Sequence, residues 1–274
     1  MKTAIVFDSA GTLLRVYRVA WDVKKGVLVE NVVSTNMIAA GGKCVLIALR
    51  IDTIEYFEKA DPCMAISDFI AGGKVDFDVI CRGLKCTSER IGASIALDKS
   101  AIMRDIKEAI EAVKLKCKDI YYLNIGLVVD IANDEIPYVL ATGGRIFPGA
   151  KETVEKLISG GADVYIASGD NRRSLDALAC DLGIDKSNVY DAVSPSGKMD
   201  LVVRLEEKYD LVVMVGDGIN DQLAFQAADM SILTLQQEGM KPDVLYETAD
   251  VIIDDIREVE GAVRESLHTN ISNK

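Results

Sequence analysis

Two apolar runs, far apart in the chain, each end at a group of acidic residues. Residues 4–7 (AIVF) lead into Asp8, and residues 211–215 (LVVMV) lead into 216–221 (GDGIND). Short runs that are apolar at every position are typical of strands with both faces buried in a parallel sheet. Reactive groups of α/β proteins lie at the carboxyl ends of such strands. The pattern therefore predicts that the two acidic groups converge at one edge of a sheet.

Residues 148–267 alternate between strand and helix patterns. Strands are predicted at 163–167, 189–193, 211–215, 230–233 and 251–253. Helices are predicted at 149–159, 172–182, 197–208, 219–227 and 256–267. The first of these helices has Pro148 at its start and a glycine pair at its end, as helices commonly do. Alternation of this kind predicts an α/β fold, a Rossmann-like parallel sheet with helices on both faces.

Residues 16–147 carry a different, mixed pattern. Strands are predicted at 27–29, 44–49, 121–123 and 126–129, and glycine pairs at 41–42, 72–73 and 143–144 interrupt the region. The segment 101–113 (AIMRDIKEAIEAV) has the apolar spacing of an amphipathic helix. We therefore predict that 16–147 form an inserted α+β cap domain.

The domain organisation follows from this insertion. Residues 1–15 and 148–274 are predicted to form the catalytic core, on either side of the cap domain at 16–147. Hinges between the two are expected near residues 15–22 and 141–149.

Composition narrows the function classes. The chain of 274 residues has a formal net charge of −12, which opposes binding to nucleic acid or to an anionic membrane surface. It has no run of about eighteen apolar residues that could span a membrane, and its N-terminus does not resemble a signal peptide. The six cysteines and single histidine lack the paired spacing of a structural zinc site. We expect the cysteines to be free thiols in a reducing cytosol, and therefore a cytoplasmic protein. From the charge and the missing apolar run we expect no nucleic acid partner and no membrane partner.

The polar residues at the predicted strand ends suit phosphoryl transfer. The Asp8 carboxylate can attack phosphorus and form an aspartyl-phosphate. The Ser168 hydroxyl and nearby backbone N–H groups can hold phosphate oxygens. These N–H groups lie around Ala10, Gly11 and Gly169. Ser168 and Asp170 also suit helix N-caps, a structural role that is compatible with the functional one.

The remaining polar residues suit charge neutralisation and metal binding. Lys198, at the start of a predicted helix, can neutralise charge shared between the nucleophile and the phosphoryl group. Asp217 can hold Mg²⁺ against Asp8 and the phosphate, because carboxylate oxygens are the ligands that this hard cation prefers. Asn220 and Asp221 lie directly behind it in the sequence and can support it.

These segments resemble the four motifs of the haloacid dehalogenase (HAD) superfamily of phosphotransferases. They are DSAGTLL at 8–14, SGDN at 168–171, the lysine at 198 and VGDGINDQLAF at 215–225. The greatest resemblance is to the phosphorylation domain of P-type ATPases, whose segments are DKTGTLT, TGDN and GDGxNDxxAL. Four motifs in the same order and spacing form a specific signal, although each alone is weak. The resemblance covers residues 1–15 and 148–265, about half of the chain, and none of the insert.

The resemblance implies a HAD fold and a role for each site residue. It implies that the catalytic residues are Asp8, Lys198 and Ser168. It implies that phosphate is bound by Ala10, Gly11, Thr12, Ser168, Gly169, Asp170, Lys198 and Asn220. It implies that Mg²⁺ is bound by Asp8, the backbone carbonyl of Ala10, Asp217 and Asp221.

The chain departs from the family pattern at Ala10. Most HAD phosphatases have a second aspartate at this position, which protonates the leaving group and activates water, and alanine can do neither. General acid–base help typically contributes about 10²–10⁴-fold to a rate. P-type ATPases have threonine there, and phosphonoacetaldehyde hydrolases have alanine together with a cap lysine that forms a Schiff base. Lys43 is a lysine of the predicted cap that could enter the site and take such a role.

We interpret the chain as a Mg²⁺-dependent phosphohydrolase that acts on a small phosphorylated substrate through an aspartyl-phosphate. A phosphonatase and an ATP-using phosphotransferase are alternatives within the enzymes. A regulatory module that binds phosphate with little turnover is an alternative outside them, and it is Ala10 that keeps this alternative open. A P-type pump is not expected, because the chain has no apolar run that could span a membrane.

Overall fold

The computed structural model describes most of the chain. The described residues are 1–30, 32, 37–38, 43–50, 55–73, 75–117, 120, 122–170 and 172–272, the last five without their side chains. Gly41, Gly42, Tyr121 and Asn171, which were named above, lie outside this described part.

The chain divides into two compact units. Unit 1 comprises Met1–Val16 and Arg145–Lys274, and unit 2 comprises Tyr17–Gly144. These boundaries lie close to the predicted ones at 15/16 and 147/148. The assignment of unit 1 as a catalytic core and unit 2 as a cap stays a prediction.

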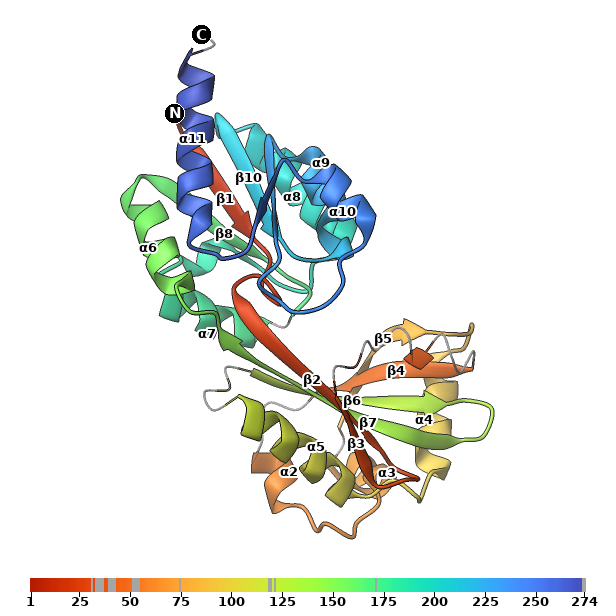
Figure 1. Cartoon of the computed structure of the whole chain (residues 1–274). Helices are drawn as coiled ribbons and strands as arrows, with labels where there is room; N and C mark the ends of the chain where they lie inside the picture. Colours follow the sequence, from red (N-terminus) through yellow and green to blue (C-terminus); the bar gives the residue numbers. More distant parts are fainter. Residues whose placement is uncertain are drawn as a thin grey trace. The chain divides into compact units, whose positions relative to one another are not determined.

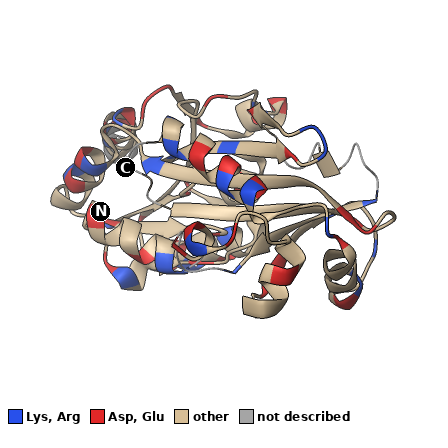
Figure 2. Ribbon diagram, turned by 90° about the horizontal axis from the view of Figure 1, so that it is seen from below, with Lys and Arg blue, Asp and Glu red and all other residues tan. Residues whose placement is uncertain are grey.

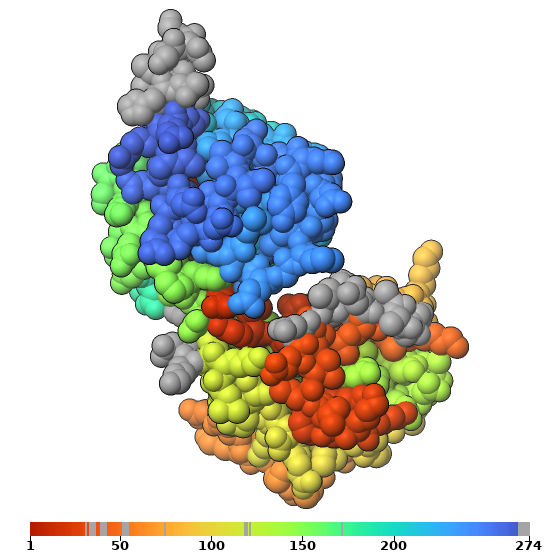
Figure 3. Space-filling model, in the orientation of Figure 1, coloured from red at the N-terminus to blue at the C-terminus, as the bar shows by residue number. Residues whose placement is uncertain are grey.

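Unit 1 is built on a six-stranded parallel sheet (Figure 1). Its strands are β1 (Thr3–Phe7), β8 (Ala162–Ala167), β9 (Val189–Tyr190), β10 (Leu211–Gly216), β11 (Met230–Thr234) and β12 (Val251–Ile253). The spatial order is β12-β11-β10-β1-β8-β9, and every neighbouring pair is parallel. The N-terminal strand β1 therefore lies inside the sheet, between two strands that come much later in the sequence. All five of its residues are buried. The space-filling view of unit 1 accordingly shows mostly later segments of the chain, coloured green and blue (Figure 3).

Helices cover both faces of this sheet, with α6 and α7 on one side and α8, α9 and α10 on the other (Figure 1). The helices are α6 (Ala150–Ser159), α7 (Arg172–Leu182), α8 (Pro195–Glu206), α9 (Gln222–Ala227), α10 (Asp243–Thr248) and α11 (Glu258–Ser272), with 3₁₀ turns η1 (Lys186–Asn188) and η2 (Ile219–Asp221). Alternate residues of β1 face opposite layers: Ala4 and Val6 pack in one cluster with Val202 of α8 and Phe225 of α9. The α/β class, the parallel sheet and its two helical layers are confirmed.

Most elements of unit 1 lie close to their predicted ranges. The strand predicted at 189–193 is shorter than expected, since β9 is only Val189–Tyr190 and Ala192 has a positive φ of 51° that no strand adopts. The helix predicted at 219–227 is divided into η2 and α9, because the chain stays in a tight turn through the acidic motif. Helix α10 was not predicted, since its six residues are too few for a helical period to be visible.

Unit 2 contains a second six-stranded sheet, of order β3-β2-β7-β6-β4-β5. Its strands are β2 (Leu14–Asp22), β3 (Val27–Glu30), β4 (Cys44–Leu49), β5 (Phe77–Arg82), β6 (Tyr122–Asp130) and β7 (Glu135–Ile146). Its helices are α2 (Glu55–Lys59), α3 (Ile66–Gly73), α4 (Ser88–Leu97) and α5 (Met103–Lys116). β3 pairs antiparallel with β2, and β6 pairs antiparallel with β4 and β7. Ile106 and Ile110 of α5 pack in one core with Ile47 and Leu127 of the sheet, so the α+β class is confirmed.

The segments predicted to contain hinges are largely strand. β2 spans 14–22, where β-branched and aromatic residues favour an extended chain. β7 runs through Gly143 and Gly144, a pair that we had interpreted as an interruption. A Cβ at these positions would lie 2.5 Å from Val113 Cγ1 and 2.4 Å from Tyr122 Cε1, respectively. The two glycines therefore permit a close approach of side chains to a continuous strand.

Basic and acidic residues are interspersed along the helices (Figure 2). Several of them form surface ion pairs, such as Lys114 with Glu58 at 2.7 Å in unit 2 and Arg172 with Asp176 at 2.7 Å in unit 1. Exposed pairs of this kind contribute little to stability. Within the part of the chain that the structure describes, no helix is both long enough and apolar enough to cross a membrane.

Candidate active site

Asp8 lies directly after β1, at the carboxyl edge of the parallel sheet. Its backbone N–H donates to the carbonyl of Val215 in the neighbouring strand β10 at 2.9 Å. Because β1 and β10 run in register, with Phe7 beside Val215, the chain reaches Asp217 at the same edge of the sheet. The carboxylates of Asp8, Asp217 and Asp221 each offer an oxygen, and these oxygens lie within 4.8 Å of one another. The structure thus brings the two acidic groups together.

Lys198 connects two of these carboxylates. It lies in the first turn of α8, which Ser194 caps by accepting a hydrogen bond from the Gly197 N–H at 3.2 Å. The side chain of Lys198 is only 1% exposed. Its Nζ donates to Asp8 Oδ1 at 2.5 Å and to Asp221 Oδ1 at 2.6 Å. A buried ammonium between two carboxylates holds both of them in place.

Asp221 is buried and orders the acidic loop. While Oδ1 accepts from Lys198, Oδ2 accepts from the backbone N–H groups of Asp217 at 3.2 Å and Gly218 at 3.1 Å. A Cβ at Gly216 would lie 2.5 Å from Asp221 Oδ2, so only glycine lets the backbone approach this carboxylate. Both oxygens of Asp221 therefore have protein donors, and its part as a metal ligand stays a prediction.

Asp217 packs against Gly11 in the loop that follows Asp8. Gly11 has φ +89°, in the left-handed region that favours glycine. A Cβ at this position would lie 2.3 Å from Asp217 Cγ. The predicted close approach of loop and carboxylate is therefore present in the structure, and it needs a glycine on both steric and conformational grounds.

We expect Gly11→Ala to destabilise the protein more than the matched change Gly161→Ala. Gly161 has φ +90°, but a Cβ there meets nothing within 4 Å, so it shares only the backbone strain. Collision with Asp217 should add about 1–3 kcal/mol, the usual effect of overpacking. Urea unfolding of both variants measures the difference, and equal destabilisation would contradict this account of Gly11.

Lys241, which was not predicted from the sequence, contacts the acidic cluster. Its Nζ donates to Asp217 Oδ2 at 2.5 Å, and its side chain is 9% exposed. The residue lies in the segment between β11 and α10, directly before Pro242. A single lysine in a loop carries no periodicity or motif, so no sequence signal distinguished it from the other lysines.

Burial governs the charge states of the cluster. It raises the pKa of Asp8 well above its ordinary value, against the opposing effect of Lys198. It also raises the pKa of Asp217, against the opposing effect of Lys241. Burial lowers the pKa of Lys198, but Asp8 and Asp221 outweigh this effect and raise it, so the ammonium stays charged. Burial thus disfavours the charged forms of Asp8 and Asp217, which lie close together. A further cation beside them would favour the charged forms and lower both pKa values.

The acidic cluster fits a hard divalent cation such as Mg²⁺. Three carboxylates contribute only oxygen donors, and one ammonium, Lys198, sits deep among them. If all three carboxylates are ionised, the cluster of these carboxylates and Lys198 carries two net negative charges, not counting Lys241, which pairs with Asp217. Mg²⁺ prefers oxygen ligands and neutralises a charge of this size. The residues that could hold it are Asp8 and Asp217. Asp221 would support them through its hydrogen bonds to Lys198 and to the Asp217 N–H.

The loop after Asp8 contains unpaired hydroxyl groups. Ser9 Oγ and Thr12 Oγ1 are buried and have no hydrogen-bond partner among the described residues. The N–H groups of Gly11 and Thr12 donate within the loop, to the carbonyls of Leu14 at 2.7 Å and Ser9 at 3.3 Å. These two hydroxyls lack a hydrogen-bond partner among the described residues, whereas phosphate binding by the N–H groups of Gly11 and Thr12 stays a prediction.

The other predicted phosphate-binding residues lie around this edge with local partners. Ser168 follows β8, which is paired with β1, and it is buried. Its hydroxyl donates to Asp170 Oδ2 at 3.0 Å and accepts from the Asp170 N–H at 3.2 Å. Gly169 is exposed, and so is Asn220 in η2. Ala10 is half-buried. The roles of these residues in binding stay predictions.

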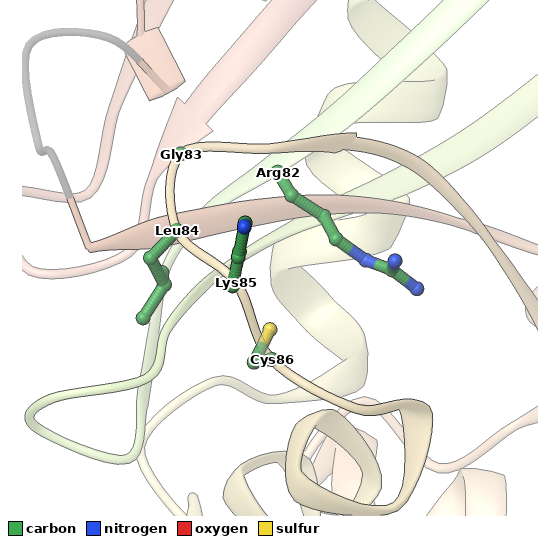
Figure 4. Close-up of a pocket in the computed structure, with 5 residues that line it drawn as sticks. All are labelled: Arg82, Gly83, Leu84, Lys85 and Cys86. Carbon is green, nitrogen blue, oxygen red and sulfur yellow. The ribbon is translucent and has the colours of Figure 1, made fainter.

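Unit 2 has a shallow hollow of its own, with a volume of about 420 Å³. Arg82, Lys85 and Cys86 line it, with Gly83 and Leu84 between them, at the end of β5 and in the segment that follows (Figure 4). Lys43, the cap lysine of the phosphonatase alternative, is exposed just before β4.

Comparisons with known proteins bear on this site. A family model described as haloacid dehalogenase-like hydrolase matches residues 2–229. A relative from Methanocaldococcus jannaschii named soluble P-type ATPase-like phosphatase is 29% identical over 274 residues, which cover 100% of this chain and 97% of that protein. The probable copper-importing P-type ATPase A of Enterococcus hirae is 36% identical over 127 residues, which cover 46% of this chain but 17% of that protein.

Among solved structures, a catalytic CPx-ATPase domain named CopB-B aligns with a TM-score of 0.48 and 18% identity, over 97% of this chain and 90% of that domain. The resemblance inferred from the four motifs is confirmed by the family match, which spans Asp8, Lys198 and the acidic loop. The chain therefore belongs to the haloacid dehalogenase-like hydrolases.

Proposed function

We propose that this hydrolase is a Mg²⁺-dependent phosphatase, which cleaves a small phosphorylated substrate through an aspartyl-phosphate on Asp8. The observation that carries the proposal is the cluster at the sheet edge. There, Asp8 is held by buried Lys198 within 4.8 Å of two further carboxylates. The Methanocaldococcus jannaschii relative that aligns over the whole chain is named a phosphatase, which supports the same reaction class.

Asp8 is oriented to act as the nucleophile. Lys198 binds Oδ1 at 2.5 Å, so Oδ2 is the oxygen to which we assign the attack. In the first step a bond forms between Oδ2 and phosphorus, and the bond between phosphorus and the leaving-group oxygen breaks. In the second step water attacks the phosphorus, which releases inorganic phosphate and restores the carboxylate. Lys198 opposes the rise that burial causes in the pKa of Asp8, and so favours the carboxylate that attacks.

The carboxylates of Asp8 and Asp217 would hold Mg²⁺, with Asp221 supporting them from behind. When bound, the cation would neutralise charge on the transferring phosphoryl group. Asp221 orients both sides of this arrangement, because it accepts from Lys198 and from the Asp217 N–H.

Ala10 determines which substrates suit this site. Its methyl group cannot protonate a leaving group, so an alkoxide would have to depart unprotonated or take a proton from elsewhere. An acyl phosphate has a leaving group of low pKa that needs no such proton. We therefore propose that the site favours substrates with good leaving groups over simple alkyl phosphates.

We expect Ala10→Asp to raise the hydrolysis rate of an alkyl phosphate by at least about tenfold, because the added carboxyl group can protonate the leaving oxygen. Hydrolysis of an acyl phosphate should change much less. Ala10→Asn is the matched control, since it has the same shape without the acid. Steady-state phosphate release measures all three proteins. An equal gain for both substrates, or a gain with Asn, would contradict the missing-acid argument.

The test of the proposed function is direct detection of the intermediate. The full chain is mixed with Mg²⁺ and a panel of phosphate esters, acyl phosphates, phosphonates and nucleotides, and phosphate release is recorded. The reaction with the best substrate is then quenched in acid within milliseconds and digested for mass spectrometry. We expect a phosphoryl group on Asp8. Turnover without any modified Asp8 peptide, or turnover independent of Mg²⁺, would contradict the mechanism.

We also propose a cytoplasmic location and no nucleic acid partner. All six cysteines are free in the structure, as thiols in a reducing compartment would be. The net charge of −12 opposes binding to polyanions. The phosphonates and nucleotides in the substrate panel separate the phosphatase from a phosphonatase and from an ATP-using phosphotransferase, whose product would be ADP.

A further inference from the structure

The segment that carries Lys241 is hydrogen-bonded to the loop that follows Asp8 and to the start of β2. Gln236 donates through Nε2 to the Thr12 carbonyl at 2.8 Å and accepts at Oε1 from the Ile256 N–H at 3.1 Å. Gln237 accepts at Oε1 from the Val16 N–H at 2.8 Å and donates through Nε2 to the Val16 carbonyl at 3.1 Å. These two glutamines hold the start of the segment beside the acidic cluster, within five residues of Lys241.

Lys241 contacts the carboxylate that the proposed function assigns to the metal. Its Nζ donates to Asp217 Oδ2 at 2.5 Å, and both side chains are largely buried, at 9% and 14% exposure. This contact uses one of the two oxygens through which Asp217 would bind Mg²⁺. Lys198 does not play the same part, since it binds Asp8 and Asp221.

The charges around Asp217 oppose the presence of Lys241 and Mg²⁺ on this carboxylate at the same time. With Lys198 in place, the three carboxylates leave two net negative charges, which a divalent cation alone neutralises. If Lys241 remained on Asp217 as well, the cluster would carry a surplus positive charge. Like charges held within a few ångströms in a buried site repel strongly.

We propose that Lys241 is an internal counter-ion, which occupies Asp217 Oδ2 in the absence of Mg²⁺ and has to leave it when Mg²⁺ binds. This inference rests on the proposed function, which places Mg²⁺ at this site. It adds that Lys241 controls the affinity of the site for Mg²⁺. Lys241 stabilises the metal-free protein by pairing with a buried carboxylate, and for the same reason it weakens Mg²⁺ binding.

The surroundings permit this displacement. Met240, directly before Lys241, is 100% exposed, so no packing holds the chain at that residue. Gly239 has φ +133°, a conformation that glycine adopts readily. The tethers at Gln236 and Gln237 lie upstream, so the ammonium can move toward solvent without breaking them.

Mg²⁺ binding to the full-length protein, measured by isothermal titration calorimetry without substrate, tests the proposal. We expect Lys241→Met to tighten the Mg²⁺ dissociation constant by about ten- to a hundredfold, because no charge-assisted hydrogen bond then has to be broken. Lys241→Arg, which keeps the charge, should stay near wild type. Lys208→Met, at an exposed position after α8, is the matched control and should leave the dissociation constant unchanged.

Thermal unfolding gives a second readout. Lys241→Met should lower the Tm of the metal-free protein, because Asp217 loses its partner, and saturating Mg²⁺ should then raise Tm by more than in wild type. If the variant does not fold, a crystal structure of wild type with Mg²⁺ decides: we expect Lys241 Nζ beyond hydrogen-bond distance of Asp217. An ammonium that stays on Asp217 beside the bound ion overturns the proposal.

The outcomes separate this inference from the proposed function. If wild type and Lys241→Met bind Mg²⁺ equally tightly, Lys241 is not a competing counter-ion, while the metal-dependent phosphatase stands. If neither protein binds Mg²⁺, the metal site itself is wrong, and both proposals fall. Weaker Mg²⁺ binding by Lys241→Met would also overturn the inference, since it would show that Lys241 supports the ion.

Discussion

Asp8→Asn should lower phosphate release by at least about a thousandfold, with the fold unchanged. The amide is close to the carboxylate in size, but it is a far weaker nucleophile and cannot form the aspartyl-phosphate. Removing a covalent nucleophile leaves only the rate enhancement that binding and charge stabilisation supply. Asp8 Oδ1 is also the oxygen that accepts from Lys198, and the amide oxygen can keep this hydrogen bond.

The measurement is Mg²⁺-dependent phosphate release with the best substrate of the panel. Asp200→Asn is the matched control, since Asp200 is an exposed aspartate on α8 and belongs to the same unit. Circular dichroism melts should show that both variants fold. If Asp8→Asn kept a tenth or more of the wild-type rate, while Asp200→Asn behaved as wild type, Asp8 would not be the nucleophile.

Lys198→Met should both inactivate the enzyme and destabilise it, by about 3–5 kcal/mol in the free energy of unfolding. This is the usual effect of removing one partner from a buried ion pair, because it leaves uncompensated charge in the interior. Here two buried carboxylates, Asp8 and Asp221, lose the same partner. The methionine side chain fills most of the space of the lysine side chain. The loss of stability therefore measures the missing charge more than lost packing.

Urea unfolding in the absence of metal checks the second prediction. Lys151→Met, at an exposed position on α6, is the matched control and should stay within about 0.5 kcal/mol of wild type. The double variant Lys198→Met with Asp8→Asn should be more stable than Lys198→Met alone, because one of the two unpaired charges is gone. A loss below about 1 kcal/mol for Lys198→Met would show that the cluster does not depend on this ammonium.

Local patterns were sufficient for most of unit 1. Strands such as 211–215 are apolar at every position, and helices such as 172–182 have a clear apolar stripe, so both match the structure closely. Unit 2 was harder to predict. Its strands β2 and β7 contain charged residues or glycines and are partly exposed, so their alternation is weak. The short helices α2 and α3 are stabilised by packing in the unit 2 core rather than by their own pattern.

The sequence by itself determined the class of fold, the place of the acidic groups at strand ends and the family, because these depend on residue types and their spacing along the chain. Only the tertiary structure decided which charges face one another. Lys198 lies between Asp8 and Asp221, Gly11 lies against Asp217, and Lys241 reaches Asp217 from a loop with no motif. The physical reason is that Coulomb interactions depend on distance in space, and the charged partners here are 23 to 190 residues apart along the chain.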